Sequence, residues 1–243
     1  MKLLIDAGNT KIKSAVYYQG EEIISSTSSE LASNHLDDIF TYFPKISRAI
    51  ISSVRPVNEH VVEQLKQRVP TIELCHSTPL PVKVLYKTPN TIGTDRLAAA
   101  SGACKLFPDT DLLIADIGTA ITIDYVNSSG ELIGGNISPG MMLRFKALNN
   151  LTANLPLECP NSDVSHIGQT TSEAIQAGVQ NSIKYELEGY ISSFLKNTPN
   201  GKVVVTGGDA KFFAKTIKSP IFVVCNLGMV GLHTILEHNV KNS

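Results

Sequence analysis

The chain has 243 residues, a mass of 26.2 kDa and a formal charge of −1, from 21 basic and 22 acidic side chains. Hydrophobic residues make up 42% and charged residues 18%, which is enough apolar material for a core and too little charge for a disordered chain. The near-zero charge argues against a nucleic-acid-binding protein, and the length allows one large domain or two small ones.

The four cysteines lie at positions 75, 104, 159 and 225, too far apart for a CxxC redox or zinc motif. We expect them to be buried thiols in a reducing compartment. No apolar run approaches the roughly 18 residues of a membrane span, and Asp6 interrupts the N-terminus too early for a signal-peptide core. These features predict a cytoplasmic protein that binds neither membranes nor nucleic acid.

Strands and helices alternate through the first half of the chain. Strand patterns around two turns come first, and an apolar face at Val57, Val61, Val62 and Leu65 predicts one of the helices that follow. The expected elements are a helix over 33–43, a strand over 48–54, a helix over 57–68, a strand over 71–75, a loop over 76–90 with strand character at 82–85, and a helix over 94–107. Thr94 is the expected N-cap of the last helix.

The second half alternates in the same way, which indicates an α/β fold. Its longest helix is predicted over 171–195, because apolar residues recur there at every fourth position. The other expected elements are strands over 111–115, 120–126 and 132–137, a helix over 140–150, a loop over 152–166, a strand over 202–206 followed by a helix, a strand over 221–225, and a helix over 226–237.

The second half also repeats the beginning of the first. Residues 3–10 align with residues 113–120 at an offset of 110, and the match continues without a gap. The identical pairs include Asp6 and Asp116, Gly8 and Gly118, Val16 and Val126, Gly20 and Gly130, Glu21 and Glu131, and Ile23 and Ile133. Both copies predict three strands joined by an Asp-x-Gly turn and a glycine-centred turn. We therefore expect a duplication, with domains at residues 1–110 and 111–243.

Each Asp-x-Gly turn offers groups that suit a nucleotide phosphate. A strand ends at an aspartate, a glycine lets the backbone turn sharply, and polar side chains follow as Asn9-Thr10 and as Thr119. Backbone N–H groups and hydroxyls in such a turn can bind phosphate oxygens, while the carboxylate can hold a metal ion. An ordinary hairpin turn favours the same residues, but two copies at matching positions favour a phosphate clamp.

Two further segments carry polar groups at predicted helix starts. Gly207-Gly208-Asp209 follows a buried strand, so its backbone can approach a ligand, although glycine pairs are also common in turns. In Gly93-Thr94-Asp95-Arg96, Asp95 can simply complement the helix dipole. Arg96 gains nothing from that dipole, which favours a role in ligand binding.

Five motifs stand in one order along the chain: Asp6-x-Gly8-Asn9-Thr10, Gly93-x-Asp95-Arg96, Asp116-x-Gly118-Thr119-Ala120-x-Thr122, Gly134-Gly135-x-Ile137-x-Pro139-Gly140 and Gly207-Gly208-Asp209. In this order they resemble the type III pantothenate kinase family, and the resemblance covers essentially the whole chain. It implies α/β architecture with two duplicated ribonuclease-H-like (actin-like ATPase) domains, each with a mixed sheet flanked by helices. The family belongs to the superfamily of acetate and sugar kinases, heat-shock chaperones and actin.

The resemblance also implies ATP-dependent phosphorylation of the primary hydroxyl of pantothenate to 4'-phosphopantothenate, the first step of coenzyme A biosynthesis. Asp6 to Lys13 would form the first phosphate loop, with Gly8, Asn9 and Thr10 in it and Asp6 placing Mg²⁺. Thr119, Gly207 and Gly208 would add contacts to Mg-ATP held between the two domains, and Asp116 would bind a monovalent cation, K⁺ or NH₄⁺. Because the chain has no P-loop lysine, bound metal ions must neutralise the triphosphate.

By the same resemblance, Asp95 binds the substrate and acts as the general base, accepting the proton of the attacking hydroxyl. Arg96, Tyr86 and the backbone of Gly93 and Thr94 would bind pantothenate. Thr171 would be a further pantothenate ligand, often reaching the site of the other subunit, while Thr170 and Glu173 form a capping box for the long helix.

The family also implies a homodimer, with the site completed across the interface. The stripe of the 171–195 helix, broadened by Tyr190 and Phe194, is either core or that interface. Two other functions stay open: a kinase for another small hydroxyl or carboxylate substrate, and a non-catalytic nucleotide-binding regulatory or accessory protein on the same scaffold. The short chain speaks against a sugar kinase, and the intact acids at positions 6, 95 and 116 favour turnover.

Overall fold

The computed structural model describes residues 1–241, which form two compact units. The first unit comprises residues 1–108, residues 130–132 and the C-terminal segment that begins at Leu227; the second comprises residues 109–129 and 133–226. The expected domain over 111–243 ends in two residues outside the described range. Within the described residues, no helix combines the length and the apolar character needed to cross a membrane.

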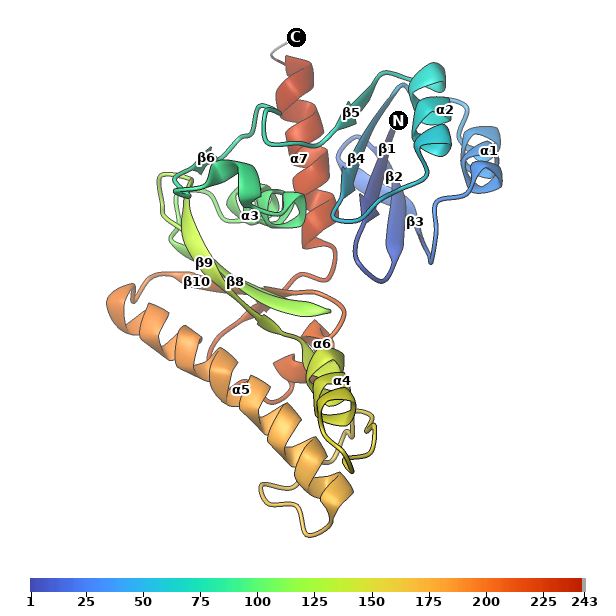
Figure 1. The fold of residues 1–243 in the computed structure, drawn as a ribbon. Coiled ribbons are helices and arrows are strands. Elements are labelled where there is room, and N and C mark those ends of the chain that lie inside the picture. Colours follow the sequence, from blue (N-terminus) through green and yellow to red (C-terminus); the bar gives the residue numbers. More distant parts are fainter. Residues whose placement is uncertain (242–243) are drawn as a thin grey trace. The chain divides into compact units, whose positions relative to one another are not determined.

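A mixed five-stranded sheet forms the centre of the first unit (Figure 1). Its order is β3-β2-β1-β4-β5, with β1 antiparallel to β2 and parallel to β4. The strands are β1 (Lys2–Ala7), β2 (Ile12–Tyr18), β3 (Glu21–Ser28), β4 (Arg48–Ser53) and β5 (Thr71–Glu73). The central position of β1 places Asp6 near the end of the strand between two neighbours.

Alternating apolar side chains on β1 face helices on both sides of this sheet. Leu3 and Ile5 share a core with residues of α1 (Ser33–Tyr42) and α2 (Glu59–Arg68). Leu4 points to the other face and packs with residues of α7 (Leu227–Lys241). This alternation is the two-residue period of a strand buried on both faces, and it fixes the register of β1.

Helix α3 (Thr94–Leu106) lies against α7 at unusually close range. A Cβ atom added to Gly102 would collide with the backbone of Leu227, and one added to Gly231 would collide with the backbone of Ala98. The two glycines therefore allow the helix backbones to touch. A short 3₁₀ turn, η1 (Pro89–Thr91), precedes α3 and overlaps the end of the segment 76–90, which the sequence predicted to be a loop.

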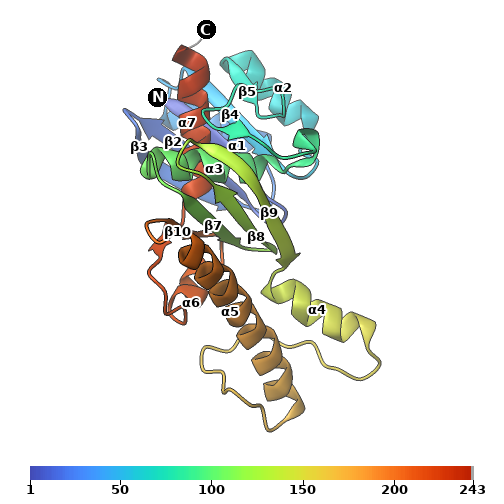
Figure 2. The ribbon, with the colours of Figure 1, turned by 90° about the vertical axis from the view of Figure 1, so that its left-hand side faces the viewer.

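The sheet of the second unit is also mixed, with the order β11-β10-β7-β8-β9-β6. Figure 2 shows β7, β8, β9 and β10 side by side, with α5 running away from them. The strands are β7 (Leu112–Ile117), β8 (Ala120–Val126), β9 (Glu131–Pro139), β10 (Lys202–Thr206) and β11 (Phe222–Val223), and β6 (Lys83–Val84) of the first unit pairs with residues 131 and 132. The helices are α4 (Met141–Leu151), α5 (Thr171–Asn197) and α6 (Ala210–Ala214).

The two sheets share the strand order expected of two related copies. The order β3-β2-β1-β4-β5 matches β9-β8-β7-β10-β11, and the directions of the pairs β1–β2, β1–β4 and β4–β5 recur in β7–β8, β7–β10 and β10–β11. The ungapped alignment is wrong inside the second strand, however. Val16 lies opposite Leu3, whereas Val126 lies opposite Leu112, one position earlier in its copy. The turn after Asp6 is longer than the turn after Asp116.

The predicted α/β class, with two mixed sheets flanked by helices, is confirmed. The prediction of buried cysteines is wrong, and the interface alternative for the 171–195 helix loses its supporting argument. Cys75, Cys159 and Cys225 are exposed and Cys104 is half-buried, so none is a fully buried thiol. Tyr190 and Phe194 pack against the core of their own unit, so they give no support for an interface.

Candidate functional site

Asp6 is the centre of a group of polar residues in the first unit. It lies beside Lys13 on β2 and Ser52 on β4, and the start of α7 comes so close that a Cβ on Gly228 would lie 3.7 Å from its Oδ2 atom. Burial raises the pKa of the Asp6 carboxyl to about 6; the Lys13 charge opposes this shift, and the Asp95 charge adds to it. The predicted phosphate-loop residues Asp6 and Lys13 and the predicted base Asp95 are therefore brought together. We call this group, with Gly8, Asn9 and Thr10, the Asp6 cluster.

The loop of this cluster is held from outside by an arginine that the sequence did not single out. Asn9 and Thr10 are exposed, as a ligand-binding loop requires. Arg55, just after β4, donates one hydrogen bond to the Asn9 carbonyl at 3.4 Å and another to the Ser29 carbonyl at 2.5 Å. Arg55 thus joins the loop after β1 to the loop after β3 and adds a positive charge beside the predicted phosphate loop.

Backbone at the start of α3 holds the Asp95 carboxylate in place. Gly93 is the N-cap of this helix, not Thr94 as predicted, and the Arg96 backbone N–H donates to Asp95 Oδ1 at 2.8 Å. A Cβ on Gly93 would overlap the same oxygen, so the glycine leaves room for the carboxylate in this position. The Thr94 hydroxyl is buried and accepts a hydrogen bond from Ser52 Oγ at 2.9 Å. That bond ties the start of α3 to the strand beside Asp6.

The two predicted pantothenate contacts Arg96 and Tyr86 also meet. The Arg96 side chain is buried, and its guanidinium carbon lies 5.5 Å from the centre of the Tyr86 ring, a cation–π arrangement. The contact fixes an arginine directly after Asp95, in the unit that holds the Asp6 cluster. A guanidinium in this position can bind a carboxylate such as that of pantothenate.

In the second unit, Asp116 lies on β7 opposite Thr122 of β8 and Thr206 of β10. Gly207 has φ of +98°, and a Cβ there would collide with Asp116 Oδ1 and the Ile117 carbonyl oxygen. The turn after β10 can therefore press against the carboxylate only because it contains glycine. The Asp209 backbone N–H donates to the Ile117 carbonyl at 2.9 Å, and burial raises the pKa of the Asp209 carboxyl.

The Thr119 turn belongs to the same group, which we call the Asp116 cluster together with Gly207 and Gly208. Thr119 is exposed, and its carbonyl accepts a hydrogen bond from the Gly140 backbone N–H at 3.0 Å. A Cβ on Gly140 would collide with the Gly118 carbonyl, whereas a Cβ on Gly208 would meet no atom within 4 Å. Gly140 therefore packs directly on the turn, and the Gly208 backbone is open to a ligand.

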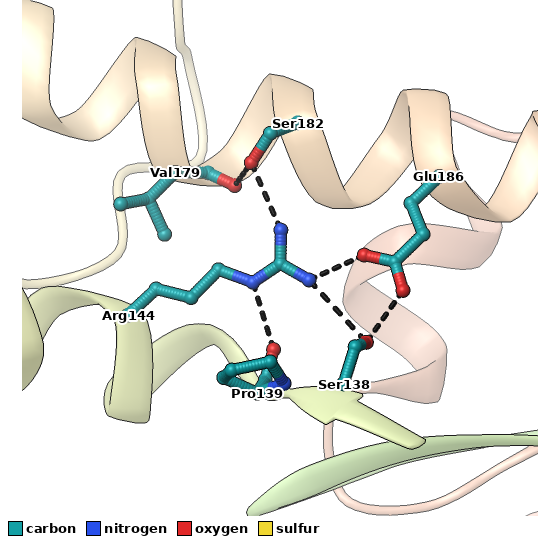
Figure 3. A network of polar contacts seen from close by, with 6 residues as sticks. All are labelled: Ser138, Pro139, Arg144, Val179, Ser182 and Glu186. Atoms are coloured by element: carbon teal, nitrogen blue, oxygen red, sulfur yellow. Dashed lines mark hydrogen bonds and ion pairs between the residues drawn. The ribbon is translucent and has the colours of Figure 1, made fainter. Parts of the chain in front are cut away.

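The segment before Gly140 is held by a second arginine (Figure 3). Arg144 of α4 donates to the Pro139 carbonyl at 2.7 Å and to Ser182 Oγ at 3.0 Å, and it forms an ion pair with Glu186 of α5. Ser138 Oγ donates to Glu186 at 2.5 Å. The end of β9, the start of α4 and the middle of α5 are thus joined through one guanidinium.

Thr171 is not brought to the Asp116 cluster within its own unit. It is the exposed first residue of α5, and both ribbon views place this end of α5 away from β7, β8 and β10 (Figures 1 and 2). The predicted capping box is present: Thr170 Oγ1 accepts from the Glu173 backbone N–H at 3.2 Å, and Glu173 Oε2 accepts from the Thr170 backbone N–H at 3.3 Å.

The residues present suit the expected metal ions in donor chemistry. The described part of the chain contains no group of three or more histidine, cysteine or acidic side chains that could enclose a metal ion. Mg²⁺ in phosphoryl-transfer sites needs only one or two carboxylates, because phosphate oxygens and water complete its coordination shell. The Asp6 carboxylate, whose charge Lys13 offsets only partly, is therefore a suitable ligand. Asp116 Oδ1 and the Ile117 carbonyl oxygen both lie next to Gly207 and are oxygen atoms, the donor type that a monovalent cation binds.

A model of the family "Type III pantothenate kinase" matches residues 2–193 of the chain. A type III pantothenate kinase of Phocaeicola vulgatus is 42% identical over 243 residues, covering 99% of this chain and all of the relative. A solved protein of Campylobacter jejuni, assigned to the Baf family of transcriptional activators, has a TM-score of 0.62 and 25% identity, covering 98% of this chain and 99% of its own. The activator of 2-hydroxyisocaproyl-CoA dehydratase from Clostridium difficile, solved with bound ADPNP, has a TM-score of 0.54 and 17% identity over 99% of this chain and 96% of its own, which is a likeness of fold.

Proposed function

The chain belongs to the type III pantothenate kinase family, and from that premise we propose how its residues phosphorylate pantothenate. The enzyme is a kinase that uses ATP, and its reaction belongs to coenzyme A biosynthesis. The observation that carries the proposed roles is the electrostatic coupling of Asp6, Lys13 and Asp95 in one cluster, next to the Arg96–Tyr86 contact. The pantothenate contacts, the general base and the first phosphate loop are thereby assigned to neighbouring residues of one unit.

In the first unit, Asp95 orients the primary hydroxyl of pantothenate and accepts its proton. The hydroxyl oxygen forms a bond to the γ-phosphorus while the bond to the β,γ-bridging oxygen breaks, so that 4'-phosphopantothenate forms and ADP leaves. In a loose transition state the base mainly positions the nucleophile and need not remove its proton early. Arg96 and Tyr86, with the backbone of Gly93 and Thr94, hold the rest of pantothenate.

Phosphate binding is divided between the two clusters. In the first, Gly8, Asn9, Thr10 and Lys13 bind phosphate oxygens, and Arg55 keeps the loop in place. In the second, Thr119 and the open backbone at Gly207 and Gly208 do the same. Mg²⁺ would be held by Asp6 and a monovalent cation, K⁺ or NH₄⁺, by Asp116; they supply the positive charge that stabilises the transferring group.

We also propose that the enzyme works in the cytoplasm as a homodimer. The exposed apolar side chains Met142, Leu143, Leu151, Leu157, Ile167 and Tyr185 lie on α4, α5 and the segment between them. A partner that covers this surface would place the exposed Thr171 next to a second chain, where it could complete that chain's pantothenate site. Sedimentation at micromolar concentration should then give twice the mass of one chain.

A coupled assay of ADP release tests the proposed function against the regulatory alternative. With ATP, Mg²⁺ and K⁺ present, we expect ADP to form only when pantothenate is added, and replacing K⁺ by Na⁺ should cause a large loss of rate. Acetate or a hexose in place of pantothenate should give only background. The absence of any ADP would favour the non-catalytic nucleotide-binding protein, whereas ADP formation that does not depend on pantothenate would mean ATP hydrolysis and would contradict the proposed substrate.

A further inference from the structure

A groove of about 680 Å³ lies in the first unit, away from the Asp6 cluster. Its walls come from the start of β1, the β2–β3 turn, the end of α3 and the C-terminal half of α7. The lining includes Lys2, Tyr17, Lys105, His233, Glu237 and Lys241. We call it the Lys105 groove. Lys2 and Asp6 are four residues apart on one strand, which separates the two places by roughly 13 Å.

The groove gathers positive charge in a chain that has a net charge of −1. Three lysines line it, against the single acid Glu237, which forms an ion pair with Lys2 and lies 3.6 Å from His233. Burial, and after it the charges of Arg48 and Lys241, lower the pKa of the Lys2 ammonium. Lys2 and Lys241 therefore repel each other, and a bound anion would relieve this repulsion.

One wall of the groove is formed by two aromatic rings, those of the buried Tyr17 and the partly exposed His233. The rings of Tyr17 and His233 are stacked, with centroids 5.0 Å apart and planes inclined by 21°. Burial, followed by the charges of Lys2 and Lys105, lowers the pKa of His233 to about 4, so its ring is neutral at pH 7. Leu106, Val230 and Pro81 add apolar surface around this pair. A ligand with a flat or apolar body can pack here while its anionic end reaches the lysines.

We propose that the Lys105 groove is a second binding site, for a phosphorylated small molecule of about nucleotide size. Its phosphate groups would lie at Lys2, Lys105 and Lys241, and its body against the Tyr17–His233 pair. The volume falls in the range of sites that bury small ligands, and a macromolecule would need a larger surface. The site is separate from the Asp6 cluster, yet β1, α3 and α7 each have one end at the groove and the other near Asp6 or Asp95. Through these elements, a bound ligand can influence the kinase.

The test uses the full chain without ATP, Mg²⁺ or pantothenate, so its result does not depend on the kinase reaction. The probe is the aromatic sulfonate 8-anilinonaphthalene-1-sulfonate, followed by its fluorescence, with inorganic pyrophosphate as competitor. We expect one saturable site from which pyrophosphate displaces the dye. The double variant Lys105→Glu/Lys241→Glu, at two exposed positions, should bind both compounds at least tenfold more weakly.

Two controls locate the binding. Lys218→Glu changes an exposed lysine of the second unit and should bind both compounds as the unaltered chain does. In Thr10→Ala, which changes the Asp6 cluster, pyrophosphate should still displace the dye. The milder pair Lys105→Gln/Lys241→Gln replaces the charge reversal if that variant melts at a lower temperature. Three results would each overturn the proposal. The groove variant could bind both compounds as the unaltered chain does, pyrophosphate could fail to displace the dye from the unaltered chain, or Thr10→Ala could be the variant in which pyrophosphate no longer displaces the dye.

Discussion

Asp6 is held in surroundings that disfavour its charge. Burial is the main cause of its raised pKa, and Asp95 adds to it because the two carboxylates are in the same cluster. Lys13 compensates only partly, so a bound cation is needed to keep Asp6 ionised at little cost. The folded chain therefore favours a bound metal ion at Asp6 even when no nucleotide is present.

Replacing Asp6 by asparagine should therefore stabilise the metal-free fold at neutral pH. The folded carboxyl titrates near 6 and the unfolded one near 3.8. As the pH rises between these values the unfolded chain has already lost the proton that the folded chain still binds, so stability falls and stays lower above pH 6. Asp6→Asn removes that loss, and we expect the free energy of unfolding at pH 7.5 to rise by about 1–3 kcal/mol.

Urea denaturation without Mg²⁺ at pH 7.5 and pH 4.5 measures this effect. The gain should shrink at the lower pH, where both states bind more of the proton, and Asp38→Asn on the exposed surface of α1 should show no gain at either pH. A lower stability of Asp6→Asn at pH 7.5 would mean that the carboxylate stabilises the fold and is not strained by it.

The sequence singled out Asp6, Asp95 and Asp116 because each stands in a motif with a nearby glycine, and their roles in the site stay predictions. Gly93 makes room for Asp95, and Gly207 makes room for Asp116. Arg55 could not be found in this way. It is a single arginine before a proline, and its value comes from two carbonyls 46 and 26 residues away, which only the folded chain brings to it.

At the scale of elements, Arg144 joins α4, α5 and the end of β9, and through Gly140 it supports the Thr119 turn. The side chains of Arg144 and Glu186 are mostly buried, with 19% and 21% exposed, so a lone partner would be left with poorly solvated charge. Arg144→Met should lower the free energy of unfolding by about 2–4 kcal/mol. The KM for ATP should also rise, since the Thr119 turn loses its support.

A thermodynamic cycle with Glu186→Gln separates the ion pair from the other bonds of Arg144. We expect the double variant to be clearly less destabilised than the sum of the two single variants, because each single change leaves one charge unpaired. Additive losses would show that the two side chains act independently, contrary to the network in Figure 3.

Close contact between α3 and α7 rests on glycine. A methyl group on Gly231 would overlap the Ala98 carbonyl, so Gly231→Ala must push the helices apart or break the contact. Thermal denaturation should show a loss of about 2 kcal/mol or more, as expected for overpacking in a core. Gly189→Ala, also in a helix but with no atom within 4 Å of the added methyl group, should instead be neutral or up to about 1 kcal/mol stabilising. Equal effects in the two variants would contradict the packing described here.

Periodicity predicted the long elements well, since α1, α2, α3, α5 and β10 begin or end within two residues of expectation. The shortest strands were overestimated: β6 and β11 have two residues each. They lie at sheet edges, where pairing with one neighbour decides the length, and residue preference alone does not report that. For the same reason the stripe on α5 could not be divided between core and interface until its partners were known.

At the scale of the whole molecule, the internal repeat foretold two sheets of the same strand order, and the motifs foretold one cluster of polar residues in each unit. The repeat could not reveal that the C-terminal helix α7 joins the first unit and begins beside Asp6. The packing of a C-terminal helix in the first unit leaves no local sequence signal, because its partners on β1 and α3 lie more than a hundred residues away in the sequence.

The proposed reaction depends on Asp95 more than on any other single side chain. The most direct measurement is kcat for Asp95→Asn with saturating ATP, Mg²⁺, K⁺ and pantothenate, beside the surface control Asp38→Asn. Loss of the group that orients and deprotonates the hydroxyl should lower kcat by roughly 100-fold or more, at unchanged melting temperature, while the control keeps full activity. An Asp95→Asn enzyme that retained the unaltered kcat would contradict the assignment of Asp95 as the base.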